Sequence, residues 1–235
     1  MSAINFVLVT ILILLSINLL GLVISLISIH SKNLHKFRRQ DKKIYPSIFY
    51  NRLPLIGFNI LSLSLLSSFG LYFLFPLFNK SMDFDILPIL LQLFIILFVD
   101  DLFFYFLHRW LHENKFLLKT IHRIHHKATA PFALEYLYVH PLEWMLGYIG
   151  PFIGIISIGV FTDSLSIWTL WIYMFVRNMH ELDVHSGYKS KIDKWIPFWG
   201  DNDHHDIHHE KLDGNYATTF TLWDHVFKTK MKKEN

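Results

Sequence analysis

The sequence predicts an all-α fold: a multi-pass membrane helical bundle with a histidine-rich helical cap on its cytoplasmic side. Several apolar stretches are long enough to cross a bilayer, which takes about 20 residues of helix. One loop between these stretches is rich in Lys and Arg. Of the 15 histidines, 13 lie between positions 108 and 225, and most of these follow an apolar stretch.

Composition narrows the class of protein. The chain is 52% hydrophobic and its mean hydropathy is +0.33, which suits membrane helices that carry a polar part. It has no Cys, which excludes disulfides, iron–sulfur clusters and thiol nucleophiles. Any metal site must therefore use nitrogen and oxygen ligands. The net charge of +3 comes without a basic tract interleaved with aromatics, so we expect no nucleic-acid partner.

The N-terminal part contains two predicted spans. Residues 4–29 are almost wholly apolar, and no Lys or Arg precedes them as it would in a signal peptide, so we expect a retained transmembrane helix. Residues 53–78, with Pro54 near their start, form the second span. The third span, residues 86–107, ends just before His108.

Two more apolar stretches follow, at 142–161 and 164–179. Thr162 and Asp163 separate them, so they are expected to form a helical hairpin that either crosses and returns or dips in without crossing. Pro151 should kink the first arm, because proline removes a helix hydrogen bond.

The distribution of basic residues predicts the orientation. Residues 31–52 hold seven Lys and Arg, which places this loop in the cytoplasm and the N-terminus on the opposite side. The third span then returns the chain to the cytoplasmic side, and the polar tail from 180 onward lies there too. All histidine clusters should therefore share one membrane face.

Three histidine clusters are the candidate metal ligands. Chance at this histidine content would give the HxxHH pattern about 0.06 times, yet it occurs twice, which favours a shared role. Offsets of three and four share one helix face, and imidazole binds Fe, Zn, Cu and Ni. One metal needs three or four ligands, so the clusters suffice for two. The clusters are His108 and His112; His122, His125 and His126; and His205, His208 and His209.

Neighbouring polar residues have open roles. Asp101 lies two helical turns before His108, where it would either orient a ligand imidazole or pair with an Arg. Asp183 could support His185, although a single His in a turn is more often structural. The residues considered as additional ligands or as support for ligands are His140 at a helix start, His180 at a helix end, His204, Asp101 and Asp183.

These motifs resemble the fatty acid hydroxylase/sterol desaturase superfamily, and most closely its C-4 methylsterol monooxygenases. The resemblance covers about residues 100–230. It rests on the three clusters and on the segments His125–Pro131, His140–Glu143, Asp183–Tyr188, His204–His209, Gly214–Ala217 and Trp223-Asp224. Together with the spans and the basic loop described above, it predicts three parts: residues 1–99 with the N-terminal transmembrane helices and the basic loop, a di-iron domain at 100–230, and a polar tail at 231–235.

The resemblance implies a membrane-bound non-haem di-iron oxygenase that uses O₂. Electrons from NAD(P)H would arrive through cytochrome b5 and its reductase, or another electron-transfer protein. The substrate would be a bilayer lipid, with the C-4 methyl group of a sterol as first candidate and a fatty-acyl lipid, hydroxylated or desaturated, as the alternative. The implied iron ligands are His108, His112, His122, His125, His126, His185, His205, His208 and His209, with Asn215 and Tyr216 as support and no catalytic residue beyond the ligands.

The sequence departs from the C-4 methylsterol branch at two positions. His180 stands where that branch has an acidic residue, and Lys228 stands where a Gly is usual.

Two rival functions fit the sequence less well. A zinc-dependent membrane hydrolase needs three ligands per metal and a carboxylate base, and the sequence lacks HExxH. A metal transporter would place its ligands near the bilayer midplane, whereas these follow the helix ends.

The predicted location depends on the source. It is the endoplasmic reticulum membrane for a eukaryotic protein and the inner membrane for a bacterial one. The terminal Lys232-Lys233-Glu234-Asn235 has the form of a dilysine retrieval signal, although a Lys-rich tail is a simpler interpretation.

Overall fold

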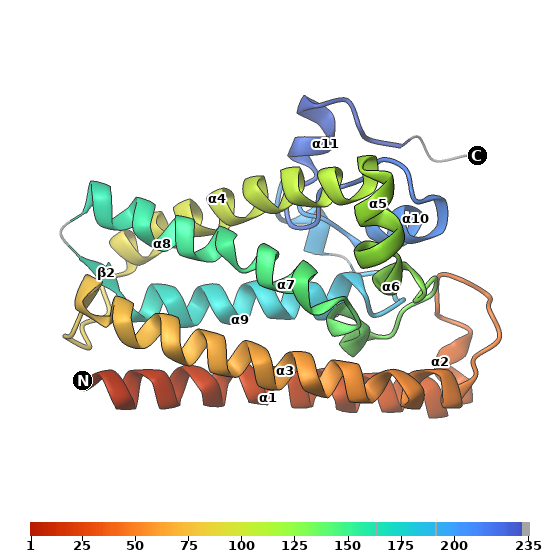
Figure 1. The fold of residues 1–235 in the computed structure, drawn as a ribbon, viewed down its shortest axis with the longest axis horizontal. Coiled ribbons are helices and arrows are strands. Elements are labelled where there is room, and N and C mark those ends of the chain that lie inside the picture. The colour runs from red at the N-terminus through yellow and green to blue at the C-terminus, as the bar shows by residue number, and fades with distance from the viewer. Residues whose placement is uncertain (163, 191, 232–235) are drawn as a thin grey trace.

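The computed structural model describes residues 1–162, 164–190 and 192–231, and the possible retrieval signal at 232–235 lies outside them. Five long helices run along the long axis of the molecule (Figure 1). They are α1 (Ala3–His30), α3 (Pro46–Leu74), α4 (Ile86–Glu113), α8 (Ile149–Phe161) and α9 (Ile167–Val184). The all-α bundle predicted from the sequence is confirmed.

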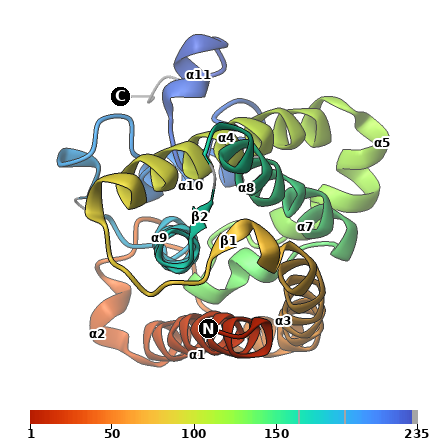
Figure 2. The ribbon, with the colours of Figure 1, turned by 90° about the vertical axis from the view of Figure 1, so that its left-hand side faces the viewer.

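The helices form two layers with α9 between them. Figure 2, which views the bundle from its N-terminal end, shows α1 and α3 on one side and α4 with α7 (Pro141–Gly147) and α8 on the other. Helix α9 contacts both α1 and α4. Four segments of the described chain are long and apolar enough to cross a membrane: Ala3–His30, Pro46–Leu77, Ile86–Glu113 and Pro141–Phe161.

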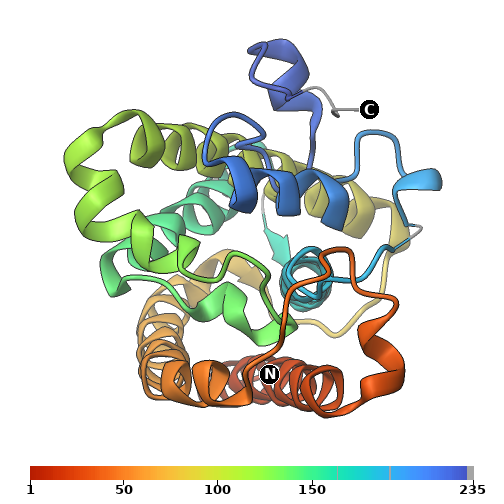
Figure 3. The ribbon, with the colours of Figure 1, turned by 90° about the vertical axis from the view of Figure 1, so that its right-hand side faces the viewer.

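The two ends of the bundle differ. At the N-terminal end, the two-residue strands β1 (Phe78–Asn79) and β2 (Leu165–Ser166) pair in parallel, a small departure from the all-α prediction. Short helices and loops cover the opposite end (Figure 3). They are α2 (Lys32–His35), α5 (Lys115–Leu117), η2 (Leu118–His122), α6 (Arg123–His126), η3 (Ala133–Leu137), η4 (Ile192–Lys194), α10 (Asn202–Lys211) and α11 (Leu222–Val226).

Helix boundaries differ from the predicted ones for identifiable reasons. Helix α3 begins at Pro46, because the first turn of a helix tolerates the missing N–H of proline. Helix α4 continues past residue 107 to Glu113 and so includes the first histidine pair. The predicted kink is a break at Tyr148 between α7 and α8, three residues before Pro151, which has no N–H to donate to the Gly147 carbonyl.

Helices α4 and α8 pack closely through two glycines. Gly150 and Gly154 lie one turn apart on α8, and a Cβ at Gly154 would lie 2.8 Å from Ile96 Cγ1. Small residues at this spacing let membrane helices approach each other closely. The contact fixes α4, which carries the first histidine pair, against α8.

The basic loop is bound to the histidine-bearing end. Arg38 donates to the carbonyls of Ala130 and Pro131, which follow the second histidine cluster. Arg39 forms ion pairs with Asp203 and Asp206 on α10, at 2.9 and 2.6 Å. The loop predicted to be cytoplasmic and the histidine clusters therefore lie at the same end of the bundle.

Candidate metal centre

The structure brings the nine predicted ligands into two groups. Among the described residues, five buried imidazoles form the first group and four form the second, and within each group the ring nitrogens lie within 4.8 Å of one another. The first group is His108, His112, His122, His126 and His208, and the second is His125, His185, His205 and His209. The groups are adjacent, because the ring centroids of His126 and His209 are 4.8 Å apart.

Local turns place the clusters. Asn114 ends α4, and its side chain accepts from the amides of Phe116 and Leu117, which starts α5 in a new direction. A π-helical turn at Leu118–His122 and α6 follow, and they return the second cluster to α4. Helix α10 supplies the third cluster and is capped at its N-terminus by Asp201, whose side chain accepts from the amide of His204.

The ring orientations of the first group point lone pairs toward a common centre. His108 Nδ1 donates to the Tyr216 carbonyl at 2.7 Å, and His208 Nδ1 donates to the Gly214 carbonyl at 2.8 Å. A carbonyl only accepts, so the proton sits on Nδ1 and Nε2 keeps its lone pair. The Nε2 atom of His122 lies 2.8 to 3.1 Å from those of His108, His112 and His126. One nitrogen cannot share protons with all three, whereas such convergence suits a cation.

The second group has the same arrangement. His185 Nδ1 donates to the Glu181 carbonyl at 2.9 Å, which leaves its Nε2 lone pair free. That Nε2 atom lies 3.0 Å from His205 Nε2 and 3.4 Å from His125 Nε2, and His209 Nε2 lies 3.1 Å from His205 Nε2. Hydrogen bonds that fix the tautomer of an imidazole are usual around metal ligands. The donor set fits iron, and metal binding by both groups stays a prediction.

Burial keeps these imidazoles neutral. It lowers the pKa of His208 to about 4, and it lowers the pKa of His125, His205 and His209 well below the usual 6.5. Neighbouring histidines lower the last three further, since positive charges would repel. Neutral rings at pH 7 are the form that binds a metal.

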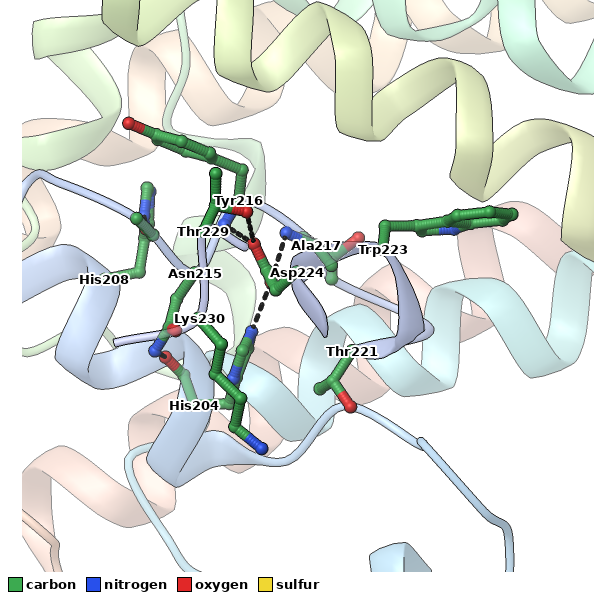
Figure 4. Close-up of polar contacts among 12 residues, drawn as sticks. His204, His208, Asn215, Tyr216, Ala217, Thr221, Trp223, Asp224, Thr229 and Lys230 are labelled. Carbon is green, nitrogen blue, oxygen red and sulfur yellow. Dashed lines mark hydrogen bonds and ion pairs between the residues drawn. The ribbon is translucent and has the colours of Figure 1, made fainter. Parts of the chain in front are cut away.

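Asp224 organises the loop that carries the Gly214 and Tyr216 carbonyls, which accept from His208 and His108 (Figure 4). Its buried carboxylate accepts from the amides of Tyr216 and Ala217 and from Thr229 Oγ1, and it lies 2.9 Å from His204 Nε2. These bonds hold the 214–217 segment beside the first group.

Lys228, in the same region, shows why a glycine is usual at its position. Its φ is 58°, in the left-handed region that glycine adopts most easily.

The supporting residues expected from the sequence lie outside both groups. His204 is buried, and its Nε2 atom lies 2.9 Å from Asp224. His180 contacts the Thr218 carbonyl, and His140 starts α7 by accepting from the amide of Leu142. Asn215 Nδ2 donates to the His204 carbonyl. Tyr216 supports His108 through its backbone carbonyl, as its phenol lies 3.2 Å from Asp213.

Both roles considered for Asp101 are wrong. Its carboxylate contacts neither a ligand imidazole nor an Arg in the described chain, because it accepts from the amides of Thr219 and Phe220 and from Trp223 Nε1. The seven-residue offset correctly places Asp101 on the helix face of His108, but donors from the 219–223 segment occupy its carboxylate there. Support of His185 by the side chain of Asp183 is wrong for a similar reason, because the Glu181 carbonyl takes that place.

Sequence reasoning missed two acidic residues near the ligands. Glu143 Oε1 accepts from His122 Nδ1 at 2.8 Å. Glu181 lies one helical turn before His185 and pairs with Arg177, which also contacts Asp100. The i, i+4 spacing of Glu181 and His185 could have indicated that Glu181 lies beside this ligand. The contact between His122 and Glu143 joins residues 21 positions apart, and the sequence holds no local signal for it.

An apolar cavity leads to the two groups. It lies between α3, α4, α7, α8 and α9, and five histidines from both groups line its inner end. Leu71, Ile155 and Leu170 line the opposite end. Along α9 the cavity runs from Leu170 to Glu181, roughly 16 Å at the rise of an α-helix.

The chain is similar in sequence to several known proteins. The chain is 37% identical over 187 residues to methylsterol monooxygenase 1 of Rattus norvegicus. The aligned region covers 77% of the chain and 58% of the relative. A methylsterol monooxygenase of Aspergillus fumigatus is 37% identical over 61% of the chain and 49% of its own length. The C-4 methylsterol oxidase of Schizosaccharomyces pombe is 35% identical over 59% of the chain and 46% of its own length. The chain thus spans about half the length of these curated relatives.

No solved structure matches the chain. A family model described as fatty acid hydroxylase matches residues 93–229, the part that holds both histidine groups and most of the cavity wall. The chain belongs to the fatty acid hydroxylase family.

Proposed function

We propose that the protein is a membrane-bound non-haem di-iron oxygenase that oxidises the C-4 methyl group of a sterol. The observation that carries the proposal is the pair of adjacent histidine groups at the inner end of an apolar cavity between membrane-crossing helices.

The two groups would each hold one iron ion. Five and four neutral imidazoles supply nitrogen ligands, and no protein thiolate competes with them, since the chain has no Cys. Bound iron supplies the activation of O₂ that side chains alone cannot provide for attack on an unactivated C–H bond. The residues of this chain orient the ligands, exclude water and align the substrate.

The substrate assignment rests on the relatives and on the cavity. The relatives carry the names methylsterol monooxygenase and C-4 methylsterol oxidase. The cavity is mostly apolar and lies between helices that a bilayer would surround, so a membrane lipid would need no transfer through water. A fatty-acyl lipid of similar length is the alternative substrate.

The electrons would come from an acidic redox protein that receives them from NAD(P)H. Four basic residues, spaced four apart, are exposed on the segment that holds the second cluster: Lys115, Lys119, Arg123 and Lys127. His122 and His126 of the first group lie on the same segment, so a carrier bound there would be close to the metals. A redox protein such as cytochrome b5 suits such a surface through charge complementarity.

The test is reconstitution in lipid with iron, a reductase system and O₂. A 4,4-dimethylsterol and a long-chain acyl lipid are offered together, and oxidation of the sterol methyl group is the expected result. Oxidation of the acyl lipid alone would remove the sterol assignment. Oxidation of neither, with electron delivery verified, would contradict the enzyme proposal. Location in the endoplasmic reticulum or in a bacterial inner membrane stays a prediction.

A further inference from the structure

Glu143 has one carboxylate oxygen bound and one free. It lies in the first turn of α7, is only 5% exposed and lines the cavity. Its Oε1 atom accepts from His122 Nδ1 at 2.8 Å. Its Oε2 atom is buried and has no hydrogen-bond partner within residues 1–162, 164–190 and 192–231.

A buried carboxylate oxygen without a partner is unusual and unfavourable. Most buried polar atoms are hydrogen-bonded, and leaving one unpaired costs its desolvation free energy. Because none of the described residues that line the cavity hydrogen-bonds to Oε2, an occupant of the cavity is the natural source of the missing partner. The occupant would therefore carry a hydroxyl group close to the metals.

The position of Glu143 matches the chemistry of the proposed substrate. The ring of His122 separates the carboxylate from the point where the Nε2 atoms of the first group converge. In a sterol, the carbon that bears the hydroxyl is bonded directly to C-4, so the hydroxyl lies beside the methyl group to be oxidised. A group that binds this hydroxyl must lie about one side chain away from the iron, as Glu143 does.

We propose that Glu143 binds the 3-hydroxyl of the sterol and so determines which methyl group faces the metals. The proposal rests on the sterol oxygenase function proposed above. In the hydrogen bond between Glu143 Oε2 and the sterol hydroxyl, one of the two oxygens donates and the other accepts, whatever the protonation state of Glu143. A plain acyl chain has no hydroxyl at this place, so Glu143 would favour sterols over acyl lipids.

Thr218 provides a matched comparison. Its Oγ1 atom is also buried, unpartnered among the described residues and part of the cavity lining. It follows Ala217 and contacts His180 through its carbonyl, away from His122. A threonine hydroxyl can rotate toward another acceptor and carries no charge, so its loss should matter less than the loss of the carboxylate.

The experiment is a competition in one tube between a 4,4-dimethylsterol and its 3-deoxy counterpart, with the full-length reconstituted protein. The readout is the ratio of the two kcat/KM values. We expect the wild type to prefer the hydroxysterol on the order of 100-fold, the usual effect of a hydrogen bond to a charged group. Glu143→Gln should reduce the preference about tenfold, because a neutral hydrogen bond remains. Glu143→Leu should abolish it, whereas Thr218→Val should change it less than Glu143→Gln does.

The ratio separates substrate recognition from structural damage. Metal loss or partial unfolding lowers both rates equally and leaves the ratio unchanged, so a Gln variant with the wild-type ratio would overturn the proposal even if the Leu variant is inactive. A wild-type ratio near one would overturn it as well, while leaving sterol oxidation intact. Oxidation of neither sterol by the wild type would overturn the proposed function, and this inference with it.

Discussion

The orientation of each imidazole, more than the number of histidines, defines the candidate metal centre. In His108, His185 and His208 a backbone carbonyl accepts a hydrogen bond from Nδ1–H, so the Nε2 lone pair points toward the centre of a group. The register of the clusters made these histidines predictable as ligands. Their carbonyl partners were not predictable. Two of them, Gly214 and Tyr216, lie in a loop whose conformation depends on hydrogen bonds to the Asp224 carboxylate, and the sequence does not reveal those bonds.

Removing one imidazole tests the group assignment. His208→Ala deletes one of the five rings of the first group, so we expect bound iron to fall from about two to about one per chain and oxidation to be lost. His225 is exposed and belongs to neither group, so His225→Ala should change neither quantity. Elemental analysis and activity of both purified variants give the answer. Equal metal loss in the two variants would show that the assignment is wrong.

Asp224→Asn tests the supporting loop. In this variant an NH₂ group faces donors that bind the carboxylate in the wild type. The resulting repulsion should displace the loop and with it the Gly214 and Tyr216 carbonyls. Loss of such support lowers metal affinity about 10- to 100-fold. Asp101→Asn is the control, because Asp101 is equally buried but holds the 219–223 segment instead. Metal titration should weaken only in the Asp224 variant, and equal affinities in the two would refute the role.

At the scale of elements, hydrophobic stretches predicted the helices but not where they end. The extension of α4 to Glu113 depends on the capping of the next helix by Asn114, and the break before α8 depends on a missing N–H at Pro151. The π-helical turn at Leu118–His122 has no sequence signature, although it sets the angle of the second cluster. Tertiary packing decides such details.

The α4–α8 contact can be tested through two glycines on one helix. A Cβ at Gly154 would lie 2.8 Å from Ile96 Cγ1 and 3.1 Å from Ile96 Cα, whereas nothing lies within 4 Å of a Cβ at Gly159. Gly154→Ala should therefore destabilise the protein by about 1–3 kcal/mol through overpacking. Gly159→Ala should be neutral or slightly stabilising, because alanine favours helix. Thermal unfolding in detergent measures both, and similar melting temperatures would contradict the close packing.

At the scale of the whole molecule, the predicted sidedness depends on charge. Seven basic residues mark the loop after the first span, and Arg38 and Arg39 tie that loop to the histidine-bearing end. The structure places the clusters and the basic loop at one end of the bundle, and the membrane side of that end stays a prediction. The cavity was not predictable, because its wall combines residues of α3, α4, α7, α8 and α9.

Labelling tests this orientation directly. The chain has no native Cys, so Met82→Cys and Lys230→Cys each introduce a single reactive site at an exposed position. A membrane-impermeant thiol reagent added to intact cells or sealed vesicles should reach the two positions from opposite sides, with position 230 on the cytoplasmic side. Labelling of both from the same side would contradict the topology.

The iron content of the folded, lipid-reconstituted protein tests the central claim most directly. Protein produced with iron-57 should contain about two iron ions per chain, and Mössbauer spectra should show nitrogen-rich non-haem sites that respond to O₂. Zinc in a sample from overexpression would not decide the question, since geometry alone does not exclude a competing metal. One metal ion per chain at full occupancy, with the second histidine group empty, would contradict the di-iron centre.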